Sequence, residues 1–422
     1  MNTKYLLLIF ICIFWFNNVF SQNDTITFNS LLQSLEQNFK LKENAFNADS
    51  VYQLKNRINN TSYLPQLNLI TQATYQSDVT SLPISIPHVT IPTLDKDQYK
   101  VALEANQIIY DGSLTKIVNK RDALSAELEA AQSKVNLTNL KDMLNKWTYL
   151  YLTNNKIKEQ LQEQKNILQK KQSEVEHLIS GGLATITDLD MLQVELLKIE
   201  QQIDALNNTC NGIISNIELL TSQKLEDKTI KYENEDVTTS DTIQRCELSL
   251  YEKRENIALL NAQFASKKRL PQVVAFGQTG YGKPGLNMLS NEFDTYYLVG
   301  LKMVLNVYDW GRSSKEKKIA LLNQKSIRNE QELFKQNVQL QQNELISSIN
   351  KIEQWMEKDL QIIELRNKIV QATNAKLLNG TAKITDYLSD LNAKTQALID
   401  LEKHKIEKKY YIQAYKIVTG IK

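Results

Sequence analysis

The chain has 422 residues, of which 50 are Lys or Arg and 48 are Asp or Glu. This near balance of charge gives no basic excess of the kind that indicates nucleic-acid binding. Gly and Pro number only 12 and 6, so most of the chain lacks helix breakers and favours long helices.

Residues 1–21 have the features of a secretory signal peptide. Lys4 supplies the positive charge, and the apolar run 5–16 is too short to cross a bilayer as a helix. Ser21 is a small residue at the expected cleavage site, so Gln22 is expected to begin the mature chain. An uncleaved anchor is the alternative. No later stretch is long and apolar enough for a transmembrane helix.

The chain contains an internal duplication. The segment 182–188, GLATITD, returns as 380–386, GTAKITD, at an offset of 198 residues. Tyr110-Asp111 returns as Tyr308-Asp309 at the same offset. Matches in the same order predict two structural repeats, 22–230 and 231–422.

The first repeat is expected to open with a helix over 22–60. Period-2 alternation then predicts strands over 64–77 and 97–111. A long helical hairpin follows over 113–225. The second repeat is expected to have the same order of elements: a helix, strands over 270–282 and 294–309, and a hairpin over 313–418.

The helices of these hairpins are unusually long. The run 113–180 has neither Pro nor Gly up to its end and would measure roughly 100 Å at the usual helical rise. In the next helix, apolar residues from Leu189 to Leu220 recur at spacings of three and four, which predicts coiled-coil packing. Short turns at Gly181-Gly182 and Gly380 join the helices, and glycine accepts the left-handed conformation that such turns require. The flanking helices must therefore be antiparallel.

Each predicted strand has one largely apolar face. Polar side chains such as Asn68, Lys100 and Lys302 lie on the opposite faces. This alternation is typical of outer-membrane strands, although a soluble sheet on a core also alternates. The apolar faces comprise Leu67, Leu69, Ala73 and Tyr75; Tyr99, Val101, Leu103 and Ile109; Val273, Ala275 and Tyr281; and Tyr297, Val299, Leu301, Met303, Leu305 and Val307.

A membrane sheet must close into a barrel, because an open edge leaves backbone groups unsatisfied in lipid. Four strands are too few to close one, so several copies must share a barrel, and three copies would supply twelve strands. Pro and Gly at the strand–helix joints would let the chain bend there. The predicted joint residues are Pro65, Asp111, Gly112, Pro271, Asp309 and Gly311.

Little in the sequence points to an enzyme, a metal site or a cofactor. His88, His177 and His404 have no metal-ligand partner four residues on, and no nucleophile or phosphate-binding motif is present. Cys210 and Cys246 fall at apolar positions of predicted helices, where Cys acts as a small buried side chain. A disulfide between them is the alternative in an exported protein.

Together, the duplication, the two strands in each half, the YDWGR sequence at 308–312 and the paired glycine turns resemble a TolC-family outer-membrane efflux protein. The resemblance covers essentially all of residues 22–422. It implies a mainly α fold with a membrane β-barrel. A homotrimer would share twelve strands, four from each chain, and an α-helical tunnel would continue the barrel through the periplasm.

The same resemblance assigns the turns to a periplasmic tip that docks an adaptor and is gated. Gly181, Gly182 and Gly380 would form the turns. Asp188 and Asp386 match acidic positions of the family's tip, whereas a favourable charge at a helix start is the simpler interpretation. Lys383 lies one residue from a basic position of the family. Asp390 lies one residue from a second acidic position, which Ser389 occupies here.

The implied function is an exit duct in the outer membrane of a Gram-negative bacterium. It would pass small molecules to the exterior after docking with a periplasmic adaptor (membrane fusion) protein and, through it, an inner-membrane pump. The outer-membrane component of a type I protein secretion system is one alternative. A periplasmic coiled-coil adaptor or structural protein is another, although adaptors usually carry one hairpin between compact β-rich modules.

Overall fold

The computed structural model describes residues 25–37, 39–80, 93–225, 228–234 and 242–421. The predicted signal peptide, 1–21, lies outside these residues, as does 81–92 of the first loop between strands. The chain divides into two compact units. Unit 1 comprises Met1–Lys42, Lys134–Cys246 and Phe334–Lys422, and unit 2 comprises Glu43–Ser133 and Glu247–Leu333.

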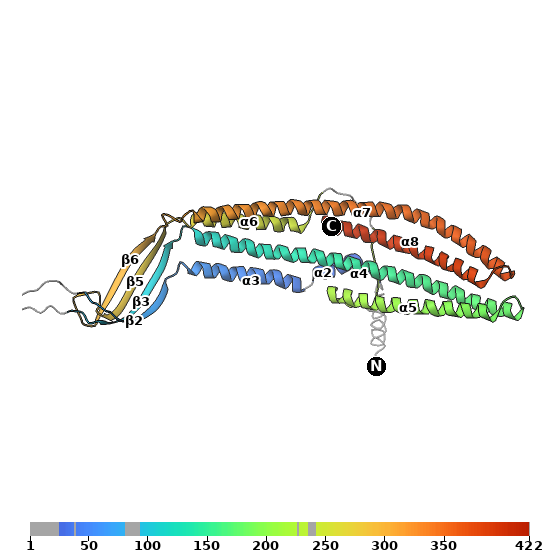
Figure 1. The fold of residues 1–422 in the computed structure, drawn as a ribbon, viewed down its shortest axis with the longest axis horizontal. Coiled ribbons are helices and arrows are strands. Elements are labelled where there is room, and N and C mark those ends of the chain that lie inside the picture. The colour runs from blue at the N-terminus through green and yellow to red at the C-terminus, as the bar shows by residue number, and fades with distance from the viewer. Residues whose placement is uncertain (1–24, 38, 81–92, 226–227, 235–241, 422) are drawn as a thin grey trace, which may run out of the picture. The chain divides into compact units, whose positions relative to one another are not determined.

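Unit 2 contains a four-stranded antiparallel sheet in the order β2-β3-β5-β6 (Figure 1). Its strands are β2 (Gln66–Tyr75), β3 (Asp97–Tyr110), β5 (Gln272–Lys283) and β6 (Asp294–Val304). The sequence extended the last strand to 309. β6 ends earlier because its partner β5 begins directly after Pro271, which has no N–H to donate to a ladder.

The strand register places the four predicted apolar faces on one side of the sheet. Leu69 lies opposite Leu103, Leu103 opposite Thr279, and Thr279 opposite Tyr297. Most large side chains on this side are exposed, and Leu301 is 74% exposed. The apolar side of the sheet therefore has no core of its own to cover it among the described residues.

Two glycines on the other side of the sheet each lie opposite an aromatic residue. Gly280 pairs with Tyr296, and Gly300 pairs with Phe276. A Cβ built on either glycine would lie 2.7 Å from the facing ring or its hydroxyl, so the rings lie against bare backbone. Such pairs cover strand glycines, and the aromatic rings therefore lie close to the backbone on the polar side of the sheet.

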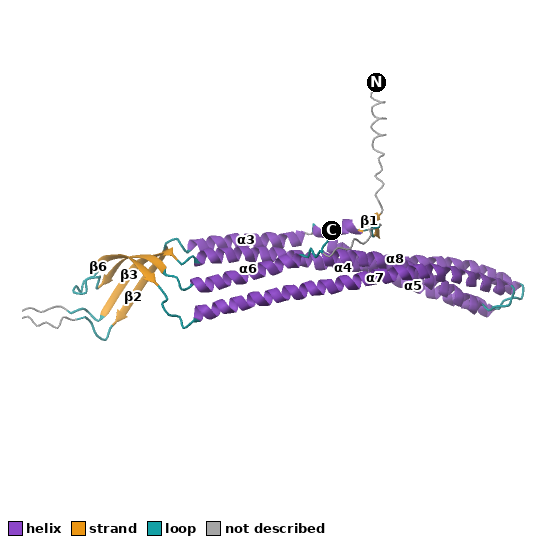
Figure 2. Ribbon diagram, turned by 90° about the horizontal axis from the view of Figure 1, so that it is seen from above, coloured by secondary structure: helices purple, strands orange, loops and turns teal. Residues whose placement is uncertain are grey.

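All helices of unit 2 meet the sheet at one end of its strands, where β2 and β5 begin and β3 and β6 end (Figure 2). The unit contains most of α3 (Phe39–Thr61) and α6 (Cys246–Lys267). It also holds the first parts of the two 67-residue helices, α4 (Leu114–Ser180) and α7 (Arg312–Leu378). These long helices lie where the sequence placed them.

The two strand-to-helix joints use one device at positions 198 residues apart. The Asp111 carboxylate accepts a 2.6 Å hydrogen bond from the Thr115 N–H, and Asp309 accepts a 3.0 Å bond from the Ser313 N–H. Burial opposes ionisation of Asp111, but hydrogen bonds from Thr115 keep its pKa below the usual value. Hydrogen bonds from Ser313 likewise lower the pKa of Asp309. Each aspartate thus starts a long helix as an anion.

The residues that follow each aspartate adopt left-handed backbone conformations. Gly112 and Ser113 have φ values of 70° and 66°, and Trp310 and Gly311 have values of 52° and 73°. The structural equivalent of Gly112 is therefore Trp310, as the offset of 198 residues indicates, whereas the predicted joint residues included Gly311 and omitted Trp310. Each joint needs two left-handed residues, and each half places its single glycine at a different one of them.

In unit 1, the segment expected as one helix over 22–60 is interrupted. β1 (Thr25–Thr27) pairs in parallel with β4 (Thr229–Lys231), and α2 (Phe28–Glu36) follows before α3 begins. The single-helix prediction is wrong because the short strand pairs with a segment about 200 residues away, which local periodicity cannot register. The later helices of this unit are α5 (Ile186–Thr221) and α8 (Ile384–Thr419).

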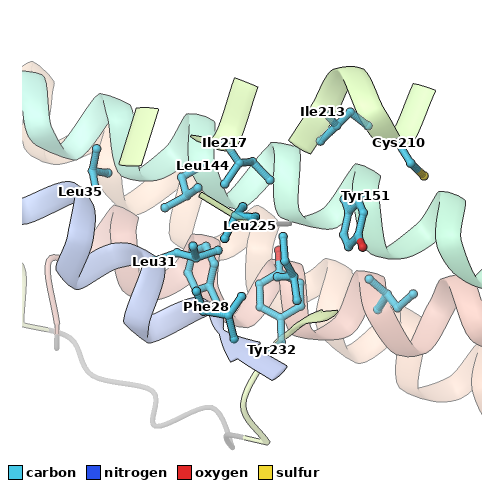
Figure 3. Packing of buried hydrophobic residues seen from close by; sticks show 13 residues of the cluster. Phe28, Leu31, Leu35, Leu144, Tyr151, Cys210, Ile213, Ile217, Leu225 and Tyr232 are labelled. Atoms are coloured by element: carbon cyan, nitrogen blue, oxygen red, sulfur yellow. The ribbon is translucent and has the colours of Figure 1, made fainter. Parts of the chain in front are cut away.

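The core beside β1 and β4 contains apolar residues from both strand segments and from α2, α4, α5 and α8 (Figure 3). Tyr232 packs on Phe28 at a ring distance of 5.2 Å, and its hydroxyl contacts the Asn145 carbonyl oxygen at 2.9 Å. Burial raises the pKa of Tyr232 well above its usual value, so the phenol stays neutral. The two ends of the first repeat are joined at this core.

Cys210 and Cys246 are not joined by a disulfide, and Cys210 is buried among apolar residues. Of the other predicted apolar positions of α5, Leu192, Ile199, Ile213 and Ile217 are buried, and the rest are half-buried. Across the part of the chain that the structure describes, no helix combines the length and apolar character needed to cross a membrane.

The two joints provide a matched test of backbone strain. Alanine at Gly112 or Gly311 must adopt a positive φ, at a cost of about 1–2 kcal/mol. At Gly112 the new Cβ would also lie 2.9 Å from the Leu270 Cβ, whereas at Gly311 it meets nothing within 4 Å. We expect Gly112→Ala to lower the thermal midpoint of the detergent-solubilised protein more than Gly311→Ala does. Equal shifts in circular-dichroism melts would contradict the close approach at Leu270.

Candidate functional site

The predicted tip residues gather at two helical turns of unit 1, between α4 and α5 and between α7 and α8. Gly182 and Gly380 have φ values of 75° and 69°. Each turn closes with the same two backbone hydrogen bonds, a pattern that satisfies the last carbonyls of a helix. These bonds run from Gly182 to Ile179 at 3.0 Å, from Leu183 to Leu178 at 2.9 Å, from Gly380 to Leu377 at 3.0 Å and from Thr381 to Lys376 at 2.9 Å.

The two turns lie next to each other. A Cβ built on Gly380 would lie 3.9 Å from Leu183 Cδ2. Gly181 is not left-handed, and its N–H donates to the His177 carbonyl at 3.2 Å as the last turn of α4. Gly181, Gly182 and Gly380 are thus brought together, and of the three only Gly182 and Gly380 are required as glycines by their backbone conformation.

Asp188 and Asp386 occupy the third position of α5 and α8. The Asp188 carboxylate accepts from the Thr185 N–H at 2.8 Å and from its hydroxyl at 2.7 Å, and the Asp188 N–H donates to that hydroxyl at 3.3 Å. This is a complete capping box. Asp386 accepts only from the Lys383 N–H, at 3.2 Å. Lys383 stands where Thr185 does and has no side-chain acceptor, so half of the box is missing in the second repeat.

The other two predicted tip residues differ in how they are held. Among the described residues, Lys383 makes no ion pair, and its side chain is exposed at the start of α8. Asp390 is half-buried and accepts a 2.6 Å hydrogen bond from the Thr373 hydroxyl of α7. Asp390 therefore joins the two helices of its hairpin, a role that its position in the sequence did not indicate.

Behind the turns, the four helices share one apolar core. Fully buried members include Leu168 of α4, Leu192 of α5, and Ile384 and Leu391 of α8. Val370 and Leu377 contribute from α7. The two hairpins are thus packed against each other over several helical turns, and a movement of one must rearrange a close-packed interface.

A lysine lies within this apolar core. Lys171 is 5% exposed, and its ammonium contacts the Asn374 Oδ1 of α7 at 2.6 Å and lies 5.0 Å from the Tyr387 ring centre of α8. It also pairs with Glu174 one turn along α4. A displacement of α7 or α8 past α4 would break the contacts of this ammonium with Asn374 and Tyr387, so Lys171 favours one axial register of the helices.

A second polar layer lies two turns away. The Gln164 side chain of α4 donates to Asn392 of α8, and Asn392 donates to Glu195 of α5 at 2.8 Å. Gln164 and Lys171 continue the buried series Leu161, Leu168 and Val175 at spacings of three and four. Polar residues inside such a series are the signal in the sequence that could have identified both layers.

The chemistry available at the turns is ionic and hydrogen-bonding. Burial, with a smaller contribution from the Glu174 carboxylate, raises the pKa of Tyr387 and keeps the phenol neutral beside the Lys171 ammonium. The described residues include no group of three or more His, Cys, Asp or Glu that could hold a metal ion. The turns expose carboxylates and glycines to solvent. The helices behind the turns contain the two layers of buried polar contacts.

No protein-family model matches the chain, and no curated protein matches it significantly. The structure is similar to solved outer-membrane proteins. VceC of Vibrio cholerae matches with a TM-score of 0.70 at 13% identity, over 93% of this chain and 96% of that chain. CusC, whose structures concern folding and transmembrane channel formation, gives 0.72 at 12% identity over 93% and 91%. The CmeC outer-membrane channel of Campylobacter jejuni gives 0.69 at 13% identity over 96% and 87%.

The chain therefore has the fold of these outer-membrane channel proteins. The predicted mainly α, TolC-like fold, with the four predicted strands in one sheet, is confirmed. The likeness covers nearly the whole of both chains, so it includes the sheet, the long helices and the hairpin turns.

The buried lysine provides a test of the helix packing. Lys171→Ala removes the donor to Asn374 and leaves a cavity, and we expect a loss of about 1–3 kcal/mol in stability. Lys165→Ala is the control, because Lys165 forms only a partly exposed pair with Glu200 at 2.8 Å, worth about 0–1 kcal/mol. Thermal melts followed by circular dichroism compare the two. Equal losses would show that the buried contacts of Lys171 add nothing to the packing.

Proposed function

We propose that three copies of this chain form a channel in the outer membrane of a Gram-negative bacterium. The single observation that carries the proposal is the open sheet: β2 and β6 each lack a partner on one side among the described residues. Such edges cannot face lipid, because their backbone groups would be unsatisfied there. The directions of the strands support closure. β2 and β6 are antiparallel to each other, so β6 of one copy can continue the ladder to β2 of the next.

The helices beside these edges carry large apolar side chains that are exposed in the single chain. α3, which leads into β2, exposes Val51, Leu54 and Ile58 on one face, with Ile58 67% exposed. α7, which follows β6, exposes Ile319 and Leu322 on one face. A head-to-tail ring would pair the α7 surface of one copy with the α3 surface of the next, and three copies supply twelve strands.

The two sides of the sheet fit the two environments of a barrel wall. The exposed apolar side would face lipid, and the side carrying Gln72, Gln98, Lys100 and Glu104 would face a water-filled lumen. The flat packing of Phe276 and Tyr296 on glycines would keep that lumen wide. The helices would continue the lumen through the periplasm as a tunnel.

The paired turns would form the periplasmic tip, where the tunnel docks an adaptor and opens. Gly181, Gly182, Gly380 and the exposed Lys383 offer a compact surface to the adaptor, which would connect the duct to an inner-membrane pump. Asp188, Asp386 and Asp390 would supply negative charge at the entrance. The register favoured by Lys171 gives the hairpins a defined packing from which they can be displaced.

Transport through the duct would be passive, because the energy comes from the pump. We propose small molecules as the cargo, with export of protein as the outcome to be distinguished. A deletion strain that accumulates small toxic solutes while its secreted proteins stay unchanged would support the first. The reverse result would assign the chain to protein secretion.

Assembly is tested by the apolar surface of α3. We expect the double variant Leu54→Glu/Ile58→Glu to lose the trimer, because it buries carboxylates without partners at the interface. Gln53→Glu places a charge on the opposite side of the same helix and should leave assembly intact. The measurement is native mass spectrometry of protein purified from outer membranes, followed by conductance in planar bilayers. A wild-type chain recovered as a soluble monomer without conductance would overturn the proposal.

The charge of the entrance is tested by Asp386→Asn. Three copies would place three of these carboxylates around the tunnel, where they would attract cations. We expect the variant to have lower cation selectivity and weaker block by divalent ions in bilayer recordings. Asp204→Asn, which removes an exposed charge in the middle of α5, is the control. Selectivity that is unchanged in Asp386→Asn would remove this residue from the entrance.

A further inference from the structure

The two ends of the sheet carry opposite charge. At the end of the sheet that joins the helices, the segments 266–269 and 309–318 contain seven basic and two acidic residues. At the other end, the described segments 77–80, 93–97 and 283–294 contain five acidic and two basic residues. The proposed orientation in the membrane does not require this difference, because strands of either charge pattern could close a barrel.

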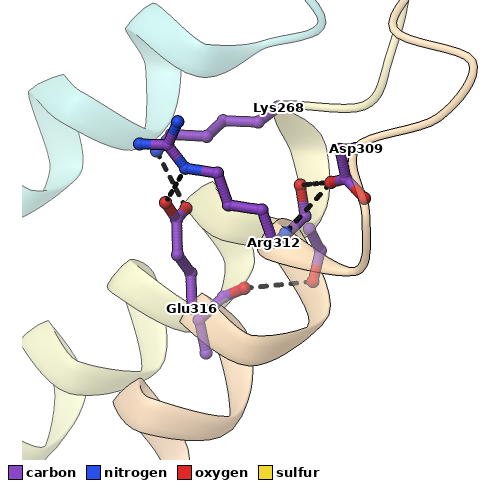
Figure 4. Close-up of polar contacts among 7 residues, drawn as sticks. Lys268, Asp309, Arg312 and Glu316 are labelled. Atoms are coloured by element: carbon purple, nitrogen blue, oxygen red, sulfur yellow. Dashed lines mark hydrogen bonds and ion pairs between the residues drawn. The ribbon is translucent and has the colours of Figure 1, made fainter.

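At the end of the sheet that joins the helices, the acidic residues already form ion pairs or hydrogen bonds (Figure 4). The Glu316 carboxylate accepts from the Lys268 ammonium at 2.9 Å and from the Arg312 guanidinium at 3.0 Å. Asp309 is occupied at the start of α7, where the N–H groups of Ser313 and Gly311 donate to it at 3.0 and 3.1 Å. One glutamate thus pairs with two cationic side chains, and this end of the sheet retains an excess of positive charge.

Two further lysines add to that excess. Lys317 and Lys318 are exposed on the second turn of α7 and make no ion pair within the part of the chain that is described. Arg269, in the turn that leads from α6 to β5, is exposed as well. These side chains are long enough to place their charged ends several ångströms from the helix axis while their stems stay on it.

A strained tryptophan lies at the same end of the sheet. Trp310 has a φ of 52° and is 81% exposed, and its ring packs edge-on against Tyr308 at 4.9 Å. A bulky residue in this conformation is costly, and the equivalent position in the first repeat is Gly112, which adopts it freely. Apart from its contact with Tyr308, the indole is exposed, so packing within the chain does not explain why a tryptophan occupies this strained position. An amphipathic ring of this kind suits the boundary between lipid and water.

We propose that Lys268, Arg269, Trp310, Arg312, Lys317 and Lys318, here termed the basic joint, bind the headgroup of an anionic phospholipid in the inner leaflet of the outer membrane. The inference rests on the proposed function, which places the sheet in the membrane and the helices in the periplasm. Trp310 then marks the boundary of the hydrocarbon. Lys317 and Lys318 lie about 9 Å farther along the helix, within reach of the headgroup layer.

Charge complementarity selects the anionic lipid over a zwitterionic one. Several lysines and arginines beside a membrane attract acidic headgroups, and each contributes to the affinity within a Debye length of the surface. Glu316 arranges Lys268 and Arg312 around one point, so the joint presents a focused charge. The lipid phosphate would accept hydrogen bonds from the guanidinium and ammonium groups, while the indole and Tyr308 contact the upper acyl chains.

The test is native mass spectrometry of the full-length protein in detergent, with phosphatidylglycerol and phosphatidylcholine of identical acyl chains as competing probes. We expect the wild type to retain phosphatidylglycerol preferentially. The double variant Lys317→Gln/Lys318→Gln should bind it roughly 25-fold more weakly, at about fivefold per lysine. Affinity for phosphatidylcholine should be unchanged, and raised salt should reduce the preference of the wild type.

Lys325→Gln/Lys358→Gln is the matched control, because it removes two exposed lysines of the same helix farther from the sheet. It should retain the wild-type preference. Equal retention of the two lipids by an intact wild-type channel, or an unchanged preference in Lys317→Gln/Lys318→Gln, would overturn this inference and leave the proposed function standing. A wild-type chain that neither forms trimers nor conducts would instead overturn the proposed function.

Discussion

The backbone of a sheet edge must find a hydrogen-bonding partner, and much of this molecule follows from that constraint. The four strands of one chain leave two edges open, at β2 and at β6. They also leave one side of the sheet apolar and exposed. In water such a surface would aggregate, and in lipid its edges would be unsatisfied. Closure with further copies removes both problems, and the apolar faces of α3 and α7 lie beside the edges that would meet.

The duplication preserves local physics more faithfully than it preserves residues. Asp111 and Asp309 start the long helices by the same hydrogen bonds, and both hairpins end in the same turn. The side chains around these bonds differ. Where the first repeat uses Gly112 at a left-handed position, the second accepts strain at Trp310. The basic joint gives that exchange a function, because the glycine only permits the turn whereas the indole can also contact lipid.

The tip combines tight packing with a few buried polar contacts. Leucine and isoleucine alone would let two helical hairpins pack in several registers of similar energy. Lys171, Asn374 and the Gln164–Asn392 pair favour one of these registers, because any other would break their contacts between helices. A gate needs this kind of defined resting arrangement, since an effector can displace only a state that is distinct from its alternatives.

By itself, the sequence determined the features that depend on local repetition. The two long helices, the glycine turns and the alternating strands were predicted near their observed bounds, because helix breakers and the periods of 3.5 and 2 act within a few residues. The aspartates at the helix starts and the mainly α fold with four strands also followed from the duplicated pattern.

Only the tertiary structure decided which distant segments meet. β1 pairs with β4, Asp390 bonds to Thr373, and Lys171 of α4 contacts Asn374 of α7. The periodic series of α4 marks Lys171 as a buried position, but no local pattern identifies the distant partner in any of these contacts. The offset of 198 residues pairs Gly112 with Trp310, but only the backbone angles show that both residues adopt a left-handed conformation. Local propensity is written in neighbouring residues, whereas register and pairing depend on the whole set of partners that a folded chain brings together.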